Sequence, residues 1–274
     1  MAEHAAWPDS LAELLAIEPA GDDCFTANLQ GGFGGLTLGC ATLAAARTCA
    51  ERSLHSLHVY FLRPVPLEKP VELRVERVKD GRRLAHRRVR VEDDGVLLCE
   101  LAASFAAAAD GVEFQEAGFD PQTPSPGELP TEEEVARREG WDDWGRAPLE
   151  WRWVGAPWQP ISAAESSAYR AWVRPRLSLH GDRGLQAATL AFLSDYHSHW
   201  PVVRRLGGTF EPDGFTSLDT VLWLHRDLPW DDWRLLASEA DVAHGGRSFT
   251  RRKLYQRDGR LVASMAQEAL VAPR

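Results

Sequence analysis

The stretch SLHVYFLRP, from Ser56 to Pro64, returns in the second half of the chain as SLDTVLWLHRD, from Ser217 to Asp227. Each stretch is followed by Gly-Arg and then by Asp-Gly. The paired marks lie 163 to 165 residues apart, at Arg63 and Arg226, Gly81 and Gly246, and Asp94 and Asp258. Two copies of so long a unit are not a solenoid period, and they indicate a duplicated domain whose copies pack side by side.

Both copies predict the same order of elements. In the first copy we expect a strand at 22–30, a buried helix at 36–52, and strands at 56–63, 71–78, 82–91 and 96–107. In the second copy we expect a strand at 167–174, a helix at 184–199, and strands at 216–226, 232–241, 247–257 and 260–271. A long helix against an antiparallel meander, present twice, is an α+β architecture. If the two sheets join edge to edge, two exposed edges disappear.

The segment between the copies has a different composition. Four prolines, at 121, 124, 126 and 130, precede the acidic run Glu132–Glu134, and five tryptophans follow between 141 and 158. Such a composition is typical of a linker, here with a short polar helix capped by Thr131. The predicted division is a first domain at 1–115, a linker and Trp-rich connection at 116–160, and a second domain at 161–274.

Composition excludes several classes of function. A net charge of −9 argues against general nucleic-acid binding, because phosphate contacts need a basic surface. No segment approaches the roughly 20 apolar residues of a membrane span, and the N-terminus lacks the basic and apolar regions of a signal peptide. The four cysteines form no CxxC pair and are interpreted as reduced structural thiols. We therefore expect a cytoplasmic protein without membrane contact.

Three further patterns resemble metal-binding or phosphate-binding sites. His197-Ser198-His199 has no third ligand at a recognisable spacing, so no metal is expected. The cluster GGFGG at 31–35 lacks the GK[ST] ending of a phosphate loop. The arginine-rich strands, including Arg87 and Arg252, could bind the phosphates of coenzyme A, but a solvated strand face is the favoured interpretation.

Taken together, the quoted stretches resemble the double-hotdog acyl-CoA thioesterases of the type II, TesB-like class. The resemblance covers nearly the whole chain outside the linker. It is carried by FGG at 33–35, the two repeat stretches, LSD at 193–195 and DGRLVASMAQEALV from Asp258. It implies two fused hotdog folds, acyl-CoA as substrate, hydrolysis to free acid and CoA, and no cofactor. Hotdog proteins commonly pair further, so we expect a homodimer.

The resemblance also implies a catalytic set. Asp195 falls on the aspartate of the central helix, Ser217 on the serine or threonine that opens the next strand, and Gln267 on the glutamine of the last strand. Thioester hydrolysis without a covalent intermediate needs a carboxylate to take a proton from water, and partners that orient the water. Asp195 is the candidate base, and Ser217 and Gln267 are the orienting pair.

An oxyanion also needs donors. Backbone N–H groups at a glycine-rich helix N-terminus can supply them, which makes Gly34 and Gly35 candidates in the first copy and Gly184 in the second. All three catalytic candidates belong to the second copy, where Gln267 matches a position close to Ser104, which has no amide. The first copy is therefore expected to supply cleft wall, backbone donors and support.

Two alternatives remain at this stage. One is a binding protein that keeps the acyl cleft but has little turnover. The other is a hotdog enoyl-CoA hydratase, which is disfavoured because its aspartate and histidine pair in a short loop motif is not found in this sequence.

Overall fold

The structure is a computed structural model. It describes residues 7–29, 32–66, 69–116, 118–141, 147–162, 164–207 and 214–271. The first half contains α1 (Leu11–Leu14), β1 (Ile17–Gly21), β2 (Cys24–Ala27), α2 (Gly34–Arg47), β3 (Ser53–Phe61), β4 (Val71–Asp80), β5 (Leu84–Asp93) and β6 (Val96–Ala106). The connection contains η2 (Pro126–Glu128), α3 (Glu132–Glu139) and β7 (Leu149–Val154). The second half contains β8 (Tyr169–Pro175), α4 (Arg183–Asp195), α5 (Trp200–Arg205), β9 (Phe215–Leu224), β10 (Arg234–His244), β11 (Arg247–Tyr255) and β12 (Leu261–Val271).

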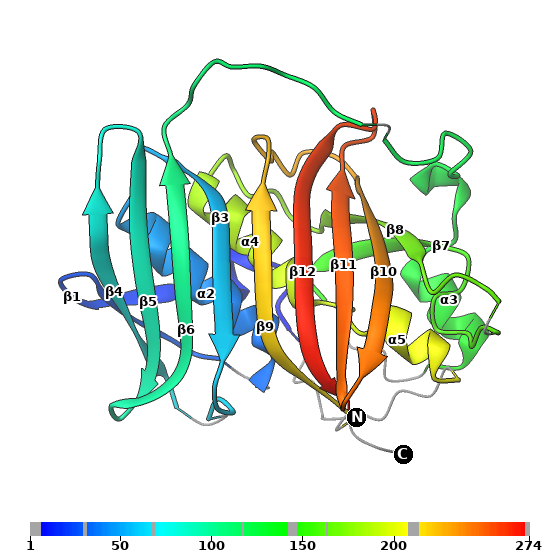
Figure 1. Cartoon of the computed structure of the whole chain (residues 1–274), viewed down its shortest axis with the longest axis horizontal. Coiled ribbons are helices and arrows are strands. Elements are labelled where there is room, and N and C mark those ends of the chain that lie inside the picture. The colour runs from blue at the N-terminus through cyan, green and yellow to red at the C-terminus, as the bar shows by residue number, and fades with distance from the viewer. Residues whose placement is uncertain are drawn as a thin grey trace.

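The described strands form one antiparallel sheet that curves around two central helices (Figure 1). Its order is β1-β2-β4-β5-β6-β3-β9-β12-β11-β10-β8-β7, so the six strands of one half mirror the six of the other. The halves meet where β3 pairs with β9, and there His58 lies opposite Val221. These two residues are 163 positions apart, as are Arg63 and Arg226, so each faces its own counterpart. The predicted repeat and the double-hotdog fold are confirmed.

Helices α2 and α4 pack against each other under the sheet. Every residue of α2 from Gly35 to Ala45 is buried, and α4 is buried continuously from Ala187 to Asp195. A helix that is apolar around its whole girth must be covered on all sides. The sheet covers one side of each helix and the partner helix covers another, which explains why both helices are rich in alanine and leucine.

Several boundaries differ from those expected. The helix predicted at 36–52 ends at Arg47. The strand predicted at 22–30 is the shorter β2, and β1, which pairs with it, was not predicted. The predicted 184–199 helix ends at Asp195, because Tyr196 is extended and His197 has a φ of +57°, which turns the chain into α5. The predicted linker includes β7, which pairs with β8 at the edge of the sheet. The helix capped by Thr131 is confirmed as α3, with a capping box to Glu134.

An aromatic cluster closes the sheet at its β7 edge. Trp151 and Trp153 of β7 are 0% and 1% exposed. The imidazole of His197 lies 4.9 Å from the Trp151 ring and 4.9 Å from the Trp200 ring, measured between centroids. Burial lowers the pKa of His197 to about 3. The aromatic cluster therefore holds this histidine in its neutral form at neutral pH.

No helix among the residues listed above is long and apolar enough to cross a membrane.

The burial of His197 predicts how stability depends on pH. An unfolded histidine has a pKa of about 6.5, so below that pH the unfolded state binds a proton that the folded state excludes. The contribution of His197 is complete above pH 6.5 and falls by about 1.4 kcal/mol per pH unit toward its folded pKa of about 3. His197→Asn tolerates positive φ and cannot titrate. Urea unfolding at pH 7.5 and pH 5 should show wild type losing about 2 kcal/mol more than this variant.

His180→Asn is the matched control, because His180 also has positive φ (+48°) but is exposed. This control should keep the pH dependence of wild type. Equal pH dependence in wild type and His197→Asn would show that His197 is not held neutral by the fold.

Candidate active site

Three polar side chains meet where the end of α4 approaches β9 and β12. Asp195 is the last residue of α4 and is 5% exposed, and Gln267 of β12 is 2% exposed. The hydroxyl of Ser217 on β9 donates to Asp195 Oδ1 at 2.8 Å. The Gln267 amide donates to the same Oδ1 and lies 3.0 Å from Ser217 Oγ. The structure thus brings together all three side chains that the sequence singled out as catalytic candidates.

A β-bulge in β9 places Ser217 on the correct face of the sheet. Thr220 pairs with Gln267 and Ser217 pairs with Ala269, so Leu218 is an extra residue in the ladder. Successive residues of a regular strand point to opposite faces. Ser217 and Thr220 are three residues apart, so in a regular strand they would lie on opposite faces. The bulge puts both on the face that carries Gln267, which is a known use of bulges beside functional sites.

The first half contributes the N-terminus of α2 to the same place. A Cβ added to Gly34 would lie 2.9 Å from Asp195 Oδ2 and 3.3 Å from the Phe61 ring. A Cβ added to Gly35 would lie 2.4 Å from the Phe33 ring and 2.7 Å from the Phe192 carbonyl oxygen. Side chains at these positions would push α2 away from α4. Two glycines therefore let the start of α2 approach the carboxylate of Asp195.

The start of α2 has no side-chain cap. Phe33 occupies the N-cap position, where it cannot accept a hydrogen bond through its side chain, and Leu36 N–H is the first to bond back to the Phe33 carbonyl, at 3.1 Å. The N–H groups of Gly34 and Gly35 precede this bond and belong to the first turn, which has no intrahelical acceptors. They also lie at the positive end of the helix dipole. This end of α2 can therefore stabilise a negative charge that develops beside Asp195.

Gly184 lies elsewhere. It is in the first turn of α4, about 16 Å along the helix from Asp195 at 1.5 Å per residue. The side chain of Asp182 caps this turn, because its Oδ1 accepts from Leu185 N–H at 3.0 Å. The structure therefore does not bring Gly184 to the three polar side chains, and a carboxylate of the chain itself already caps its end of the helix.

Pseudo-symmetry identifies the counterparts of the three side chains in the first half. The N-cap residues of the two helices, Phe33 and Asp182, are 149 residues apart, as are Ala46 and Asp195. A Cβ added to Gly184, the counterpart of Gly35, would lie 3.3 Å from Ala46 Cβ. In β3 the bulge lies between Leu54 and Ser56 and Leu54 pairs with Phe105, as Ser217 pairs with Ala269. Ala46 and Leu54 therefore replace the aspartate and the serine.

The counterpart of Gln267 is Ala103. In the ladder, Phe105 corresponds to Ala269, so Gln267 corresponds to Ala103 rather than to the neighbouring Ser104. The Ser104 hydroxyl instead lies 2.7 Å from His55 Nε2. The counterpart expected close to Ser104 is thus its neighbour Ala103, which also lacks an amide.

A cavity of about 280 Å³ occupies this equivalent place in the first half. Ala46, Leu54 and Gly184 are among its lining residues. The cavity lies at the place equivalent to the candidate active site, but the counterpart residues Ala46, Leu54 and Ala103 carry no carboxylate, hydroxyl or amide. Within the described residues, the polar constellation is thus present in one half only.

Two of the arginines expected on a solvated strand face are buried, so that expectation is wrong for them. Arg87 and Arg252 are each 2% exposed, and both face the central helices. Arg252 donates to the carbonyl oxygens of Leu193 and Ser194, the two residues before Asp195. Alternating charges along a strand do not reveal which face is buried. The burial of these two arginines can be recognised only once the ladder shows that their positions face the core.

His199 is a neighbour of the site that was not expected from the sequence. Its ring stacks on Phe215, with centroids 4.9 Å apart and planes at 16°. Burial lowers the pKa of His199, and the nearby Asp195 opposes that shift. His199 follows Asp195 by only four residues, and this short separation in sequence was the available signal that the two could lie close together. No group of three His, Cys, Asp or Glu side chains that could hold a metal occurs in the described ranges.

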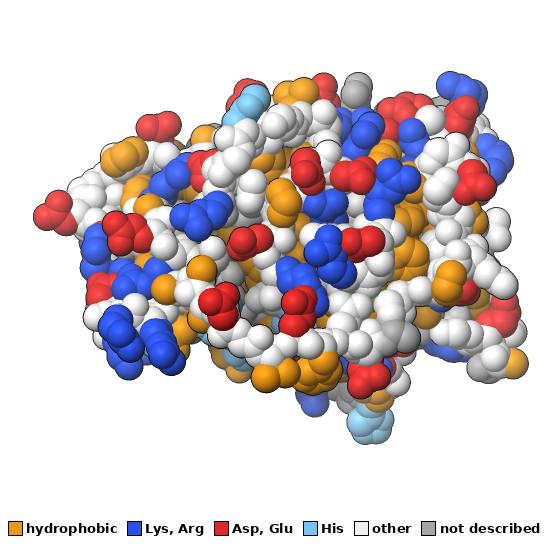
Figure 2. Space-filling view, turned by 90° about the horizontal axis from the view of Figure 1, so that it is seen from above, with side chains coloured by type: hydrophobic (Ala, Val, Ile, Leu, Met, Phe, Trp, Pro, Cys, Tyr) orange, Lys and Arg blue, Asp and Glu red, His pale blue; other side chains and the backbone are white. Residues whose placement is uncertain are grey.

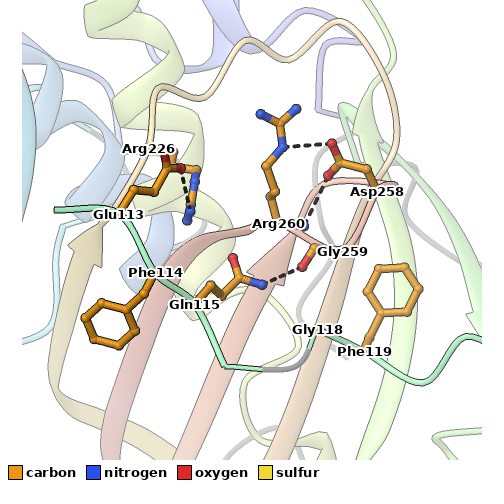
Figure 3. Close-up of a pocket in the computed structure, with 9 residues that line it drawn as sticks. All are labelled: Glu113, Phe114, Gln115, Gly118, Phe119, Arg226, Asp258, Gly259 and Arg260. Carbon is orange, nitrogen blue, oxygen red and sulfur yellow. Dashed lines mark hydrogen bonds and ion pairs between the residues drawn. The ribbon is translucent and has the colours of Figure 1, made fainter.

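A separate recess lies at the far end of β9 and β12 (Figure 3). The chain after β6 crosses the sheet there, and Gln115 Nε2 donates to the Gly259 carbonyl oxygen at 2.9 Å. The charged residues pair locally, with Arg226 to Glu113 at 3.2 Å and Arg260 to Asp258 at 2.7 Å. Basic and acidic side chains are likewise interspersed on the face shown in Figure 2. The recess is about 30 Å along β9 from Ser217 and is not part of the candidate site.

Known proteins resemble this chain along almost its whole length. Acyl-CoA thioesterase 2 of Haemophilus influenzae is 27% identical over 281 residues, which cover 96% of this chain and 97% of that protein. Human acyl-coenzyme A thioesterase 8 is 28% identical over 281 residues, covering 94% and 87%. The crystal structure of an acyl-CoA thioesterase II, TesB2, from Mycobacterium marinum superposes with a TM-score of 0.79 at 28% identity, covering 96% and 97%.

Family models describe both halves. The model of the acyl-CoA thioesterase N-terminal domain matches residues 26–107. The model of the C-terminal domain matches residues 121–271, which is more than half of the chain. A hot dog fold protein from Alicyclobacillus acidocaldarius, with a TM-score of 0.77 at 20% identity and covering 96% of this chain and 98% of that one, agrees in fold. The chain therefore belongs to the acyl-CoA thioesterase family.

Proposed function

We propose that the protein hydrolyses an acyl-CoA, or a related acyl thioester, to the free acid and the thiol by direct attack of water at Asp195. The observation that carries this proposal is the convergence of three elements, β9, β12 and the start of α2, on one carboxylate. Ser217 and Gln267 bond to Oδ1 of Asp195, and the uncapped start of α2 faces Oδ2. The acyl-CoA thioesterases similar to this chain support acyl-CoA as the substrate class.

The geometry gives each group a role. Ser217 and Gln267 hold the carboxylate through Oδ1, so Oδ2 is the oxygen that takes a proton from water. Gln267 Oε1 is buried and has no hydrogen-bond partner among the described residues, so it can accept the second hydrogen of the same water. Two acceptors fix the water and direct its lone pair at the thioester carbonyl carbon.

The remaining steps use the start of α2. As hydroxide adds to the carbonyl carbon, the carbonyl oxygen becomes an oxyanion, and the N–H groups of Gly34 and Gly35 stabilise it. The intermediate collapses with cleavage of the carbon–sulfur bond, and the thiolate leaves. Asp195 then returns its proton to the products. The second half thus supplies the base and the water site, and the first half supplies the oxyanion donors.

We propose one such site per chain. Ala46, Leu54 and Ala103 occupy the equivalent positions in the first half, and none of them can activate or orient water. In addition, Asp182 caps the start of α4, which would otherwise be the equivalent oxyanion site. The equivalent place therefore lacks the base, its partners and a free helix end.

A reducing compartment, the cytoplasm, is the proposed location. The four cysteines are free thiols. Burial raises the pKa of Cys40 to about 12 and also raises that of Cys99 to about 12, with a smaller contribution from Glu100 in the second case. Such thiols stay protonated and unreactive at neutral pH. They act as small apolar core residues, in line with a protein that does not use disulfides.

We also propose a homodimer. Tyr60 and Trp223 are 163 residues apart in sequence and are therefore equivalent positions on β3 and β9. They are 53% and 45% exposed on the outer face of the central strands, opposite the helices. Exposed aromatic side chains on a two-fold symmetric surface are typical of interfaces between copies.

Light scattering after gel filtration tests the dimer. Wild type should have twice the 30.5 kDa mass of the chain, and Trp223→Glu should have the mass of one chain. Leu270→Glu, which changes an apolar side chain that is 46% exposed at the end of β12, should remain dimeric. A monomeric wild type would contradict the proposal.

The catalytic proposal is tested with Asp195→Asn. Asparagine keeps the size of the side chain and its acceptor oxygen for Ser217 and Gln267, but it cannot take a proton at neutral pH. Loss of a general base costs about 100- to 10,000-fold, so kcat for acyl-CoAs of graded chain length should fall by about 100-fold or more. Release of free thiol is the readout, and far-UV circular dichroism checks that the fold is kept.

Ser104→Ala is the control, because it removes a hydroxyl beside the position equivalent to Gln267 in the half without the site. It should retain kcat within about twofold. A wild type that binds acyl-CoAs but releases no thiol would indicate an acyl-binding protein. An Asp195→Asn variant with wild-type kcat would place the base elsewhere.

A further inference from the structure

Arg252 of β11 has a buried guanidinium that holds the end of α4. Its Nη1 donates to the carbonyl oxygen of Leu193 at 2.8 Å and to that of Ser194 at 3.0 Å. A buried charge is costly unless it is compensated. Among the described residues, no carboxylate lies within ion-pair distance of Arg252. The carbonyl groups at the negative end of the α4 dipole face its charge instead, and the nearby Asp195 adds a favourable electrostatic interaction.

We propose that Arg252 is a positioning residue for Asp195, an inference that rests on the proposed function of that carboxylate. The two carbonyl groups it binds belong to the residues immediately before Asp195. Beyond Asp195 the helix is broken, because Tyr196 is extended and His197 has positive φ. The last turn of a helix readily frays. Arg252 fixes that turn through these two carbonyl groups, so that the carboxylate keeps its place between Ser217, Gln267 and Gly34.

The same device occurs in the first half. Arg87 of β5 is displaced by two residues from the register position of Arg252, because it pairs with Ala103, the counterpart of Gln267, whereas Arg252 pairs with Met265. Its Nη2 donates to the Thr48 carbonyl oxygen at 3.0 Å and its Nε to Thr48 Oγ1 at 2.8 Å. Thr48 is the C-cap of α2. Both arginines thus hold the C-terminus of the central helix in their own half.

The two halves differ in what the arginine supports. The end of α2 carries Ala46 at the position of Asp195, so the Arg87 contact holds a helix end without a catalytic candidate. Arg87 also pairs with Asp80 at 2.7 Å. Arg87 is therefore a natural control for Arg252, because it has the same burial and a similar contact with a helix end in the half that lacks the site.

The experiment compares Arg252→Met with Arg87→Met in the full-length protein. Methionine keeps an unbranched apolar stem of similar reach and removes every donor. A misplacement of about 1 Å can cost about 100-fold in rate, so Arg252→Met should lower kcat by about 10- to 100-fold with KM within about twofold. Arg87→Met should keep kcat within about twofold at a similar or larger loss of Tm. Arg252→Lys keeps one charged donor and should recover part of kcat, and it replaces Arg252→Met if that variant does not fold.

Hydrogen exchange supplies a readout that does not depend on activity. Arg252→Met should speed exchange of the amides of Tyr196 and Ser198, which bond to Leu193 and Asp195 carbonyl oxygens at 3.1 and 3.3 Å. If wild type has no hydrolysis, the proposed function fails and this readout still decides the positioning. Unchanged exchange at these amides, or kcat that falls in proportion to Tm equally in the Arg252 and Arg87 variants, would overturn the proposal.

Discussion

The packing of two buried, mainly apolar helices, α2 and α4, against each other is the constraint on which the rest of the structure depends. Over most of their length neither helix has a face for water, so a sheet must wrap both and join across β3 and β9. The contact of Gly34 at the start of α2 with Asp195 at the end of α4 shows that the two helices run in opposite directions. Two helix ends of opposite polarity therefore meet inside the fold, and at that place a carboxylate lies beside unpaired N–H groups.

The duplication creates two such places, and the two have diverged. One keeps Asp195, Ser217 and Gln267 with an open helix start. The other has Ala46 at the aspartate position, and its helix start is closed by Asp182. Both places have a bulge beside them and a buried arginine at the helix end, although the two arginines differ by two residues in register. The architecture is thus symmetric, while the polar groups that the proposed water attack needs lie in one half.

The repeat, most of the strands of each half and the two helices could be predicted, because period, turn residues and alternation are local signals. Asp195, Ser217 and Gln267 were found through family resemblance, since none of them differs in sequence from an ordinary surface residue. Three features could not be predicted: the end of α4 at Asp195, the ladder register that makes Ala103 the counterpart of Gln267, and the burial of Arg252. Each depends on register or on which face of a strand meets a helix, and both are settled only by tertiary packing.

Oxygen isotope transfer in a single turnover tests the central claim, direct attack of water activated by Asp195, most directly. With the enzyme in excess over an acyl-CoA in water enriched in ¹⁸O, direct attack places one ¹⁸O atom in each molecule of acid formed in the first turnover. The account predicts this labelled acid and an unlabelled protein. Unlabelled acid together with ¹⁸O in the Asp195 side chain would contradict it, because Asp195 would then act as a nucleophile through an acyl-enzyme anhydride.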